Sequence, residues 1–209
     1  MHEKALPPGS RKLLDRLEVK DPSWLQHWVL AGGTGLALHF GHRCSEDFDL
    51  FTTEEQDVLG LHRVFKQIGP YETLQESHNT LTVLARQTKV SFFSISDPFI
   101  YPTTPWRSFQ VAHVMDIALM KLIAIGGRGS RRDFIDLYAI LKHGATLQEC
   151  FDALPEKYDP SRLNTYHLLK SLTYFEDAEQ EPMPTMLEPF DWDACKTYFT
   201  RSASTLVLS

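Results

Sequence analysis

The sequence is poor in several features that would narrow its class at once. It holds only 3 cysteines among 209 residues, and their wide scatter (Cys44, Cys150 and Cys195) fits neither a disulfide framework nor the close spacing of zinc ligands. It has no uninterrupted apolar run of the roughly 20 residues that a membrane-spanning helix needs, and its first residues lack the apolar core of a secretory signal. We therefore expect a cytoplasmic protein with free thiols and no membrane partner.

The chain also lacks an excess of positive charge. Its 21 lysine and arginine residues are outnumbered by 27 acidic residues, which gives a formal net charge of -6. This balance argues against a broad, sequence-independent nucleic-acid surface, although it leaves room for a local basic patch. With 43% hydrophobic and 23% charged residues, the composition is that of a folded chain and not of a disordered one.

The hydrophobic periodicity divides the chain near Trp106. Before that point, helices are expected over residues 11–19, 34–40 and 54–68, and strand-like segments over 28–33, 47–52, 71–77, 80–86 and 89–96. Residues 97–106 are rich in proline and are expected to be a connector. After it only helices are expected, over residues 114–125, 131–143, 147–158, 161–176 and 191–201. The pattern predicts an α+β domain over residues 1–108 followed by a helical domain over 109–209.

Two acidic residues lie inside a segment that otherwise has the pattern of a buried strand. In DFDLFT, residues 47–52, the alternation puts Phe48 and Leu50 on one face and Asp47, Asp49 and Phe51 on the other. Two carboxylates at this spacing repel each other unless a cation lies between them. Oxygen ligands without a nearby histidine or cysteine favour Mg²⁺ over Zn²⁺. Taken alone, however, D-x-D is more often a pair of exposed acids on an edge strand.

A glycine pair precedes these acids. Gly32, Gly33 and Thr34 join a predicted strand to a predicted helix, which directs backbone N–H groups and one hydroxyl to a single place. This arrangement favours phosphate binding at the helix N-terminus. The alternative is an ordinary tight turn in which Thr34 caps the helix. The segment has neither the lysine of a P-loop nor the glycine spacing of a dinucleotide-binding turn.

The helical half carries a second group of candidate residues. Lys121 lies in the helix expected over 114–125, where its ammonium either reaches water or contacts phosphates. Asp133 lies three residues after Ser130, a spacing that a helix cap alone explains, and Asp136 is one turn further on. Nearby arginines suit either a phosphate or RNA backbone or a solvated loop: Arg128, Arg131 and Arg132.

Two blocks of the sequence resemble the AbiEii-type nucleotidyltransferases. The first block is the glycine turn followed by RCSEDFDLF, residues 43–51, which is similar to the family signature GGT…RxSxDFDLF. The second is DIALMKLIAIGGRGSRRDFIDLY, residues 116–138. The two blocks in this order cover most of residues 28–142, and the tail beyond them is only generically helical. The family belongs to the DNA polymerase β-like nucleotidyltransferase superfamily, and many of its members are toxins of toxin–antitoxin pairs.

The resemblance implies a nucleotidyltransferase-fold mixed sheet followed by a helical bundle packed across the active-site cleft. It also implies an enzyme that moves a nucleotide from an NTP to a hydroxyl acceptor and releases pyrophosphate. Asp47 and Asp49 would then hold Mg²⁺ and be catalytic, together with Lys121 and Asp133. The residues implied to bind the NTP are Gly32, Gly33, Thr34, Arg43, Ser45, Lys121 and Arg128. An RNA such as a tRNA is the implied acceptor, and a cognate antitoxin protein is an implied partner.

One position departs from the family pattern. Family members often read VDFF on a later strand, where the aspartate supplies a third carboxylate, but this chain has Ser91 there. A hydroxyl is a weaker Mg²⁺ ligand and a poorer base than a carboxylate, so activation of the acceptor would fall to another group such as Asp133 or Asp97. Two alternatives are therefore kept. Ser91 motivates a catalytically impaired relative that binds nucleotide and acts through partner binding. The modest number of lysine and arginine residues motivates an enzyme that modifies a small-molecule hydroxyl.

Overall fold

The computed structural model describes residues 1–19 and 22–208, which divide into two compact units. The first unit comprises Met1–Pro98 and Pro102–Ala112, and the second comprises Phe99–Tyr101 and His113–Ser209. Across the described parts of the chain, no helix is long and apolar enough to cross a membrane.

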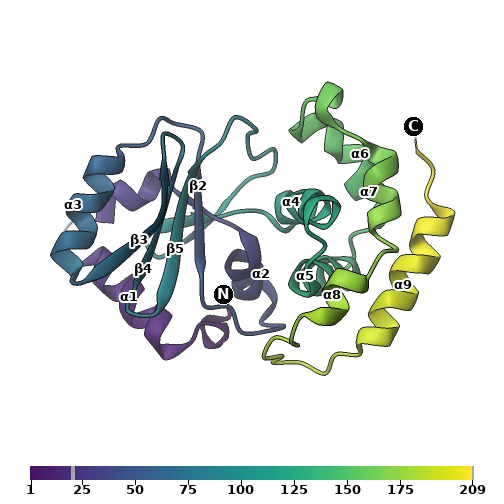
Figure 1. Cartoon of the computed structure of the whole chain (residues 1–209), viewed down its shortest axis with the longest axis horizontal. Helices are drawn as coiled ribbons and strands as arrows, with labels where there is room; N and C mark the ends of the chain where they lie inside the picture. The colour runs from purple at the N-terminus through teal and green to yellow at the C-terminus, as the bar shows by residue number, and fades with distance from the viewer. Residues whose placement is uncertain (20–21, 209) are drawn as a thin grey trace. The chain divides into compact units, whose positions relative to one another are not determined.

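A mixed sheet forms the centre of the first unit (Figure 1). Within the described residues it has seven strands in the order β3-β4-β5-β2-β1-β7-β6. The strands are β1 (Val29–Leu30), β2 (Phe48–Thr52), β3 (Tyr71–Ser77), β4 (Thr80–Ala85), β5 (Thr88–Ser94), β6 (Thr104–Trp106) and β7 (Phe109–Val111). β2 runs parallel to β5 and antiparallel to β1, whereas β3, β4 and β5 form an antiparallel meander. The strands predicted over residues 47–96 are thereby confirmed.

Helices cover both faces of this sheet. α1 (Pro8–Glu18) and α3 (Val58–Ile68) lie on one face, and α2 (Gly32–Phe40) lies on the other (Figure 1). Leu14 of α1 and Phe65 of α3 belong to one buried core with the inward-facing residues of the strands, such as Leu50 and Phe92. Two short 3₁₀ helices, η1 (Glu3–Ala5) and η2 (Pro22–His27), flank α1 in the chain. Gly41, with a left-handed φ of 69°, ends α2 as its position predicts.

The sequence pattern missed the β6–β7 hairpin. Each of its strands has three residues, which is too short for a period of two to be visible. Pro105 in β6 is tolerated because β6 is an edge strand of the sheet, where a missing N–H breaks no ladder. Because β7 pairs in parallel with β1, the first unit continues beyond residue 108 to Ala112.

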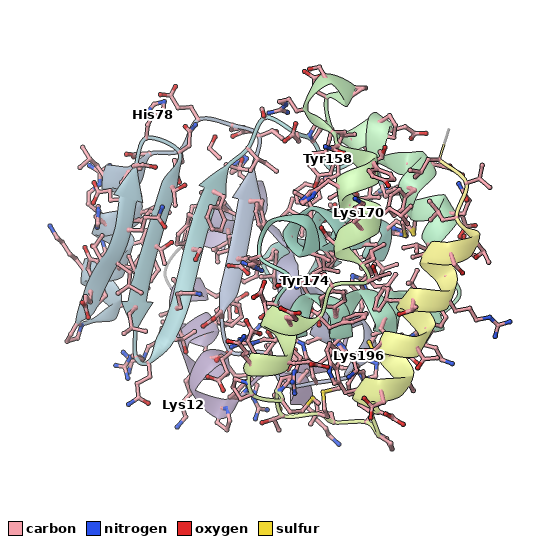
Figure 2. The ribbon with its side chains drawn as sticks, turned by 45° about the vertical axis from the view of Figure 1, so that its right-hand side comes forward. Lys12, His78, Tyr158, Lys170, Tyr174 and Lys196 are labelled. Atoms are coloured by element: carbon pink, nitrogen blue, oxygen red, sulfur yellow. The ribbon has the colours of Figure 1, made fainter. Side chains whose placement is uncertain are left out.

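The second unit is helical, as predicted. It contains α4 (Val114–Gly127), α5 (Arg131–Lys142), α6 (Leu147–Lys157), η3 (Pro160–Arg162), α7 (Thr165–Ser171), α8 (Glu176–Gln180) and α9 (Trp192–Thr205). α4 packs against α5, α6 and α7, and α5 packs against α8 and α9. Figure 2 labels Lys170 on α7 and Lys196 on α9. This confirms the α+β class with a C-terminal helical bundle.

Two helix boundaries in the second unit differ from prediction. The single helix expected over 161–176 is wrong: Asn164 accepts a hydrogen bond from the N–H of His167 and starts the shorter α7 as its N-cap. The break expected at Gly126 falls later, since α4 continues through Gly127. A Cβ atom at Gly126 would lie 2.4 Å from Leu168 Cδ2, so this glycine serves close packing of α4 against α7 and not a turn.

The three cysteines are free thiols, as predicted. Cys44 is half-buried, whereas Cys150 and Cys195 are buried in the second unit. Burial raises the pKa of the Cys150 thiol to about 12, and it also raises the pKa of Cys195. Both buried thiols are therefore protonated at neutral pH.

Candidate functional site

Asp49 lies on a polar face of the sheet, and Asp47 comes just before the strand that carries it. Along β2, Phe48, Leu50 and Thr52 are buried while Asp49 and Phe51 are half-buried, which confirms the alternation expected from the sequence. Asp49 is in register with Ser91 of β5, and Ser91 is in register with Thr82 of β4. Residues paired in this way point to the same face of a sheet. The face therefore carries a short polar row across three strands.

Asp47, just before β2, is paired with a lysine. Lys89 Nζ lies 3.4 Å from Asp47 Oδ2, and the two side chains are 44% and 37% exposed. Exposed ion pairs of this kind are weak, about 0–1 kcal/mol. The carboxylate of Asp47 is thus open to exchange its partner for another cation.

The glycine turn lies directly against Asp49. Gly32 has a left-handed φ of +61°, and a Cβ atom at this position would lie 2.7 Å from Asp49 Oδ2. The N–H of Ala31 donates to the backbone oxygen of Asp49 at 3.0 Å. Glycine is therefore required at position 32 both by the backbone conformation and by the neighbouring carboxylate. This contact brings a carboxylate to the start of α2, where backbone N–H groups have no partner inside the helix.

Thr34 and Ser45 hold the loop before β2 against α2. α2 begins at Gly32 with Ala31 as its N-cap, so Thr34 lies within the first turn and does not cap the helix. The Thr34 hydroxyl is 2.7 Å from Ser45 Oγ and also bonds the backbone oxygen of Asp47. Thr34 and Ser45 are both buried.

Arg43, another candidate from the same loop, is 3% exposed. Its Nη1 donates to the backbone oxygen of Cys44 at 3.0 Å. Arg43 is thus a buried side chain bonded to the backbone of the loop that leads to β2.

Ser91 occupies the place where the family pattern has a third carboxylate. It is 3% exposed, and its Oγ accepts a hydrogen bond from Thr82 Oγ1 at 3.3 Å. Among the residues that the structure describes, no group of three or more histidine, cysteine, aspartate or glutamate side chains is placed to hold a metal ion. Two carboxylates still fit Mg²⁺, because this ion takes one or two of them and completes its shell with water and phosphate oxygens.

The candidates of the helical half form one charged cluster inside the second unit. Lys121 Nζ lies 2.8 Å from Asp133 Oδ1 and 2.6 Å from Asp136 Oδ2. Arg128 Nε lies 2.8 Å from Asp133 Oδ2. The side chains of Lys121, Asp133 and Asp136 are 8%, 1% and 0% exposed, but that of Arg128 is 68% exposed. Of the two interpretations of Lys121, the one with its ammonium in water is wrong.

Asp133 also lies in the first turn of α5. Ser130 caps this helix as predicted, accepting from the N–H of Asp133, and Ser130 Oγ donates to Asp133 Oδ2 at 2.9 Å. Burial by itself raises the pKa of the Asp133 carboxyl. The positive charge of Lys121 and the hydrogen bonds from Arg128 and Lys121 outweigh burial, so the pKa lies below its ordinary value. Asp133 is thus an ionised carboxylate at neutral pH.

A second buried ion pair in this unit was not found from the sequence. Lys157 Nζ lies 2.8 Å from Asp116 Oδ1, and the two side chains are 1% and 0% exposed. Asp116 also accepts hydrogen bonds from the backbone N–H groups of Ile100 and Tyr101. No local pattern could reveal this pair, because its members lie on α4 and α6. The pair fixes residues 99–101 to the second unit.

Arg131, one of the basic cluster, is used within the second unit. Its Nε donates to the backbone oxygen of Ala178 at 2.7 Å, and its guanidinium lies 5.0 Å from the centroid of the Trp192 ring. These contacts join the start of α5 to α8 and α9, which favours the structural interpretation for this residue.

Comparison with solved structures identifies the class of fold. JHP933 from Helicobacter pylori is similar with a TM-score of 0.57 at 18% identity, over 97% of this chain and 91% of that chain. A Helicobacter pylori protein provisionally described as a nucleotidyltransferase is similar with a TM-score of 0.55 at 18% identity, over 98% and 95%. MenT4, a nucleotidyltransferase toxin from Mycobacterium tuberculosis H37Rv, gives 0.50 at 13% identity, over 99% and 88%. The chain thus has the nucleotidyltransferase fold.

The family follows from sequence comparison. A family model described as nucleotidyl transferase AbiEii toxin, type IV TA system, matches residues 12–89 and 79–205. An uncharacterized protein of Aquifex aeolicus (strain VF5) is 36% identical over 181 residues, which are 83% of this chain and 85% of that protein. The chain belongs to the AbiEii family of nucleotidyltransferase toxins, and it is an enzyme of that kind. The predicted family, fold class and enzyme class are confirmed.

Proposed function

We propose that this enzyme transfers a nucleotide from an NTP to a hydroxyl group of an RNA, with Mg²⁺ as its cofactor and a tRNA as the first acceptor to test. The acceptor hydroxyl loses its proton to solvent and its oxygen forms a bond to the α-phosphorus, while the bond from that phosphorus to the oxygen that bridges it to the β-phosphate breaks and pyrophosphate leaves. The observation that carries the proposal is the contact of Gly32 with Asp49, since it joins a phosphate-binding turn to a carboxylate.

In this proposal the first unit holds the triphosphate. The N–H groups of Gly32 and Gly33, at the start of α2, donate to phosphate oxygens. Asp47 and Asp49 hold the Mg²⁺, which when bound neutralises the negative charge that develops on the phosphates. Thr34, Arg43 and Ser45 belong to the same nucleotide site through the loop that they hold in place, as their burial suggests.

In this proposal the second unit supplies positively charged side chains and does not supply the general base. The lowered pKa of Asp133 makes it a weak proton acceptor, because a general base works best with a pKa near the operating pH. We therefore assign Asp133 to the positioning of Lys121 and Arg128. Arg128, with 68% of its side chain exposed, is the member of the cluster that reaches a nucleotide or RNA phosphate.

The test is a labelling assay with the full chain. Purified protein is incubated with Mg²⁺, total cellular RNA and each NTP carrying a labelled α-phosphate. Label should enter RNA from one NTP, and the rate should fall at least ~100-fold in Asp49→Asn. Mutation of the residues that only hydrogen-bond to a metal ligand already lowers metal affinity or activity ~10–100-fold, and loss of the ligand itself should cost more. Asp152→Asn, an exposed aspartate of α6, is the matched control. An undiminished rate in Asp49→Asn contradicts the proposal.

Ser91 favours one alternative, a relative that binds nucleotide without transferring it. In that case no NTP would label any RNA, while binding of the magnesium complex of an NTP would persist and would be lost in Asp49→Asn. Label that enters a small alcohol but no RNA would instead point to a small-molecule acceptor. Since the family consists of toxins, we further propose an antitoxin protein as a partner and the cytoplasm as the site of action.

A further inference from the structure

Two phenylalanine rings lie side by side on the sheet face that carries Asp49. Phe51 of β2 is in register with Phe93 of β5, and their ring centroids are 5.1 Å apart with an interplanar angle of 26°. Because side chains alternate along a strand, Phe51 shares a face with Asp49, and Phe93 shares it with Ser91. Both rings are half-buried. They therefore form a stacked aromatic pair beside the proposed metal site.

The neighbouring strand leaves one side of the Phe93 ring uncovered. Phe51 lies against one side of this ring, and the residue in register on the other side is Thr80 of β4. Threonine is too short to cover a phenyl ring. Among residues 1–19 and 22–208, Phe51 is the one aromatic ring that stacks on Phe93. The β4 side of the ring can therefore receive another flat group.

Phe93 and the glycine turn lie on opposite sides of Asp49. In the sheet, β2 lies between β1, which leads into the glycine turn, and β5, which carries Phe93 (Figure 1). A rise of about 3.3 Å per residue and a spacing of about 4.8 Å between strands put the Cα atoms of Asp49 and Phe93 about 8 Å apart. One nucleotide spans such a distance. A nucleotide with its ribose hydroxyl next to Asp49 can thus place its base on Phe93.

In-line transfer assigns the two sides of Asp49 to different substrates, and this step rests on the proposed function. The attacking oxygen and the leaving pyrophosphate lie on opposite sides of the α-phosphorus. The N–H groups at the start of α2, on the β1 side, are proposed to hold the part of the NTP that leaves. The acceptor then approaches from the β5 side, over Ser91 and Phe93.

The side chains on the β5 side suit an unpaired nucleobase. Ser91 and Thr82 supply hydroxyl groups that lie within 3.3 Å of each other, and Phe93 supplies the ring. Single-stranded RNA is bound in this way, by stacking of its bases on aromatic side chains and by polar contacts to their edges. Inside a duplex both faces of a base are covered by its neighbours. A terminal unpaired base can place one face on Phe93 and keep the other on the preceding base.

We propose that Phe93 stacks the base of the 3′-terminal nucleotide of a single-stranded RNA end and so holds a hydroxyl of that nucleotide next to Asp49. The 3′-terminal ribose is the one that carries two free hydroxyl groups. Every base has a face that can stack, so this contact orients the acceptor without reading its sequence. Phe93 is thus a binding residue for the acceptor and exchanges no proton with it.

The experiment measures RNA binding to the full chain without transfer. The probe is a short single-stranded RNA whose 3′-terminal base is the fluorescent 2-aminopurine, and the matched RNA lacks the base at that position. Both carry a dye at the 5′ end, so anisotropy gives their affinities. Stacking should quench the 2-aminopurine. The RNA without the base should bind about 5- to 150-fold more weakly, as expected for the loss of one stacked base.

Variants of Phe93 separate stacking from packing. Phe93→Leu should abolish the quenching and weaken binding of the probe by a similar factor, whereas Phe93→Tyr keeps a ring and should bind as wild type does. In the labelling assay, Phe93→Leu should raise the KM for RNA and leave the KM for the NTP unchanged. Tyr166→Leu, which removes a 60% exposed ring from α7, is the control and should change none of these values.

Three results would overturn the proposal. The first is equal affinity of wild type for the RNAs with and without the terminal base, a comparison that depends on no variant. The second is a Phe93→Tyr variant as impaired as Phe93→Leu, because the ring would then serve packing alone. The third is a rise in the KM for the NTP and not for RNA, which would place the base of the NTP on Phe93.

The two assays distinguish this inference from the function on which it rests. Label that enters RNA, together with equal binding of the two RNAs, rejects the role of Phe93 and leaves the transferase activity standing. Absence of both label and RNA binding rejects the two together. Label in RNA together with quenching that depends on Phe93 supports both.

Discussion

The two units place pairs of aspartates in contrasting environments. In the first unit Asp47 and Asp49 are half-buried, and Lys89 lies 3.4 Å from Asp47 in an exposed ion pair. In the second unit Asp133 and Asp136 are fully buried, with Lys121 Nζ within 2.8 Å of both. The first pair is accessible to a cation from solution. The second pair already has its cation within the protein.

The difference separates two uses of the same residue type. Buried carboxylates that lose their partner destabilise the fold strongly, whereas exposed carboxylates lose little. A sequence pattern cannot make this distinction, because both pairs look like candidates for catalysis. The predictions below test whether the first pair acts in function and the second in stability.

The largest effect is expected for Lys121→Met. It leaves Asp133 and Asp136 without the ammonium between them, and breaking a buried ion pair in this way costs about 3–5 kcal/mol of unfolding free energy. Urea unfolding followed by circular dichroism measures the loss. Lys142→Met, at an exposed position of α5, is the control and should change little. A loss for Lys121→Met as small as that of the control would contradict the contrast between the units.

The next largest effect is on activity. Asp49→Asn should slow transfer at least ~100-fold, which corresponds to about 2.7 kcal/mol of transition-state stabilisation, with less than about 1 kcal/mol lost in unfolding free energy. Asp136→Asn should show the reverse, with the larger loss in stability. The labelling assay and urea unfolding are run on both variants. If both lose activity and neither loses stability, the second pair belongs to the catalytic machinery.

A smaller effect is expected for Gly32→Ala. The left-handed backbone costs a non-glycine residue about 1–2 kcal/mol, and the new Cβ atom would also press on the carboxylate of Asp49. We expect lower thermal stability together with reduced binding of Mg²⁺, measured by calorimetry. Gly9→Ala in α1 has no atom within 4 Å of the added Cβ and should be neutral or slightly stabilising.

The pH dependence of the unfolding free energy should show that Asp133 is ionised in the folded protein. Because its folded-state pKa is lowered, this carboxyl contributes stability above its unfolded pKa of about 3.9, and that contribution is lost as pH falls through the folded pKa. Unfolding free energy should therefore fall as pH drops below about 5. The fall should be shallower in Asp133→Asn than in Asp152→Asn. Equal slopes would mean that Asp133 is not held ionised by Lys121.

The smallest effect is expected for Ser91→Ala. It removes one hydrogen bond with Thr82, worth about 0.5–1.5 kcal/mol, and transfer should change only a few-fold. Stability and labelling are measured beside Ser77→Ala, at an exposed position of β3. A loss of activity close to that of Asp49→Asn would show that the hydroxyl of Ser91 acts in the site.

Local patterns predicted those parts of the fold that local chemistry determines. The alternation in β2, the cap at Ser130 and the stop at Gly41 each depend on neighbouring residues, and the structure confirms all three. The short strands β6 and β7 were missed because their stability comes from pairing with a distant strand, β1, and with each other.

Within the candidate site, the sequence identified residues but not their surroundings. It placed Asp47 and Asp49 on one face, yet it could not show that Lys89 would lie beside Asp47. It raised Asp136 as a candidate without indicating that Asp136 and Asp133 share one lysine. Contacts between separate elements depend on packing, and no spacing within one element encodes them.

The chemistry of the cysteines makes this protein suitable for labelling without mutagenesis. Burial keeps the thiols of Cys150 and Cys195 protonated, so thiol-reactive dyes meet them only after the second unit opens. Cys44 is half-buried and adjoins Ser45, whose hydroxyl contacts Thr34 at the start of α2. A single dye on the natural chain therefore adjoins the proposed nucleotide site, where its emission can report nucleotide and metal binding in real time.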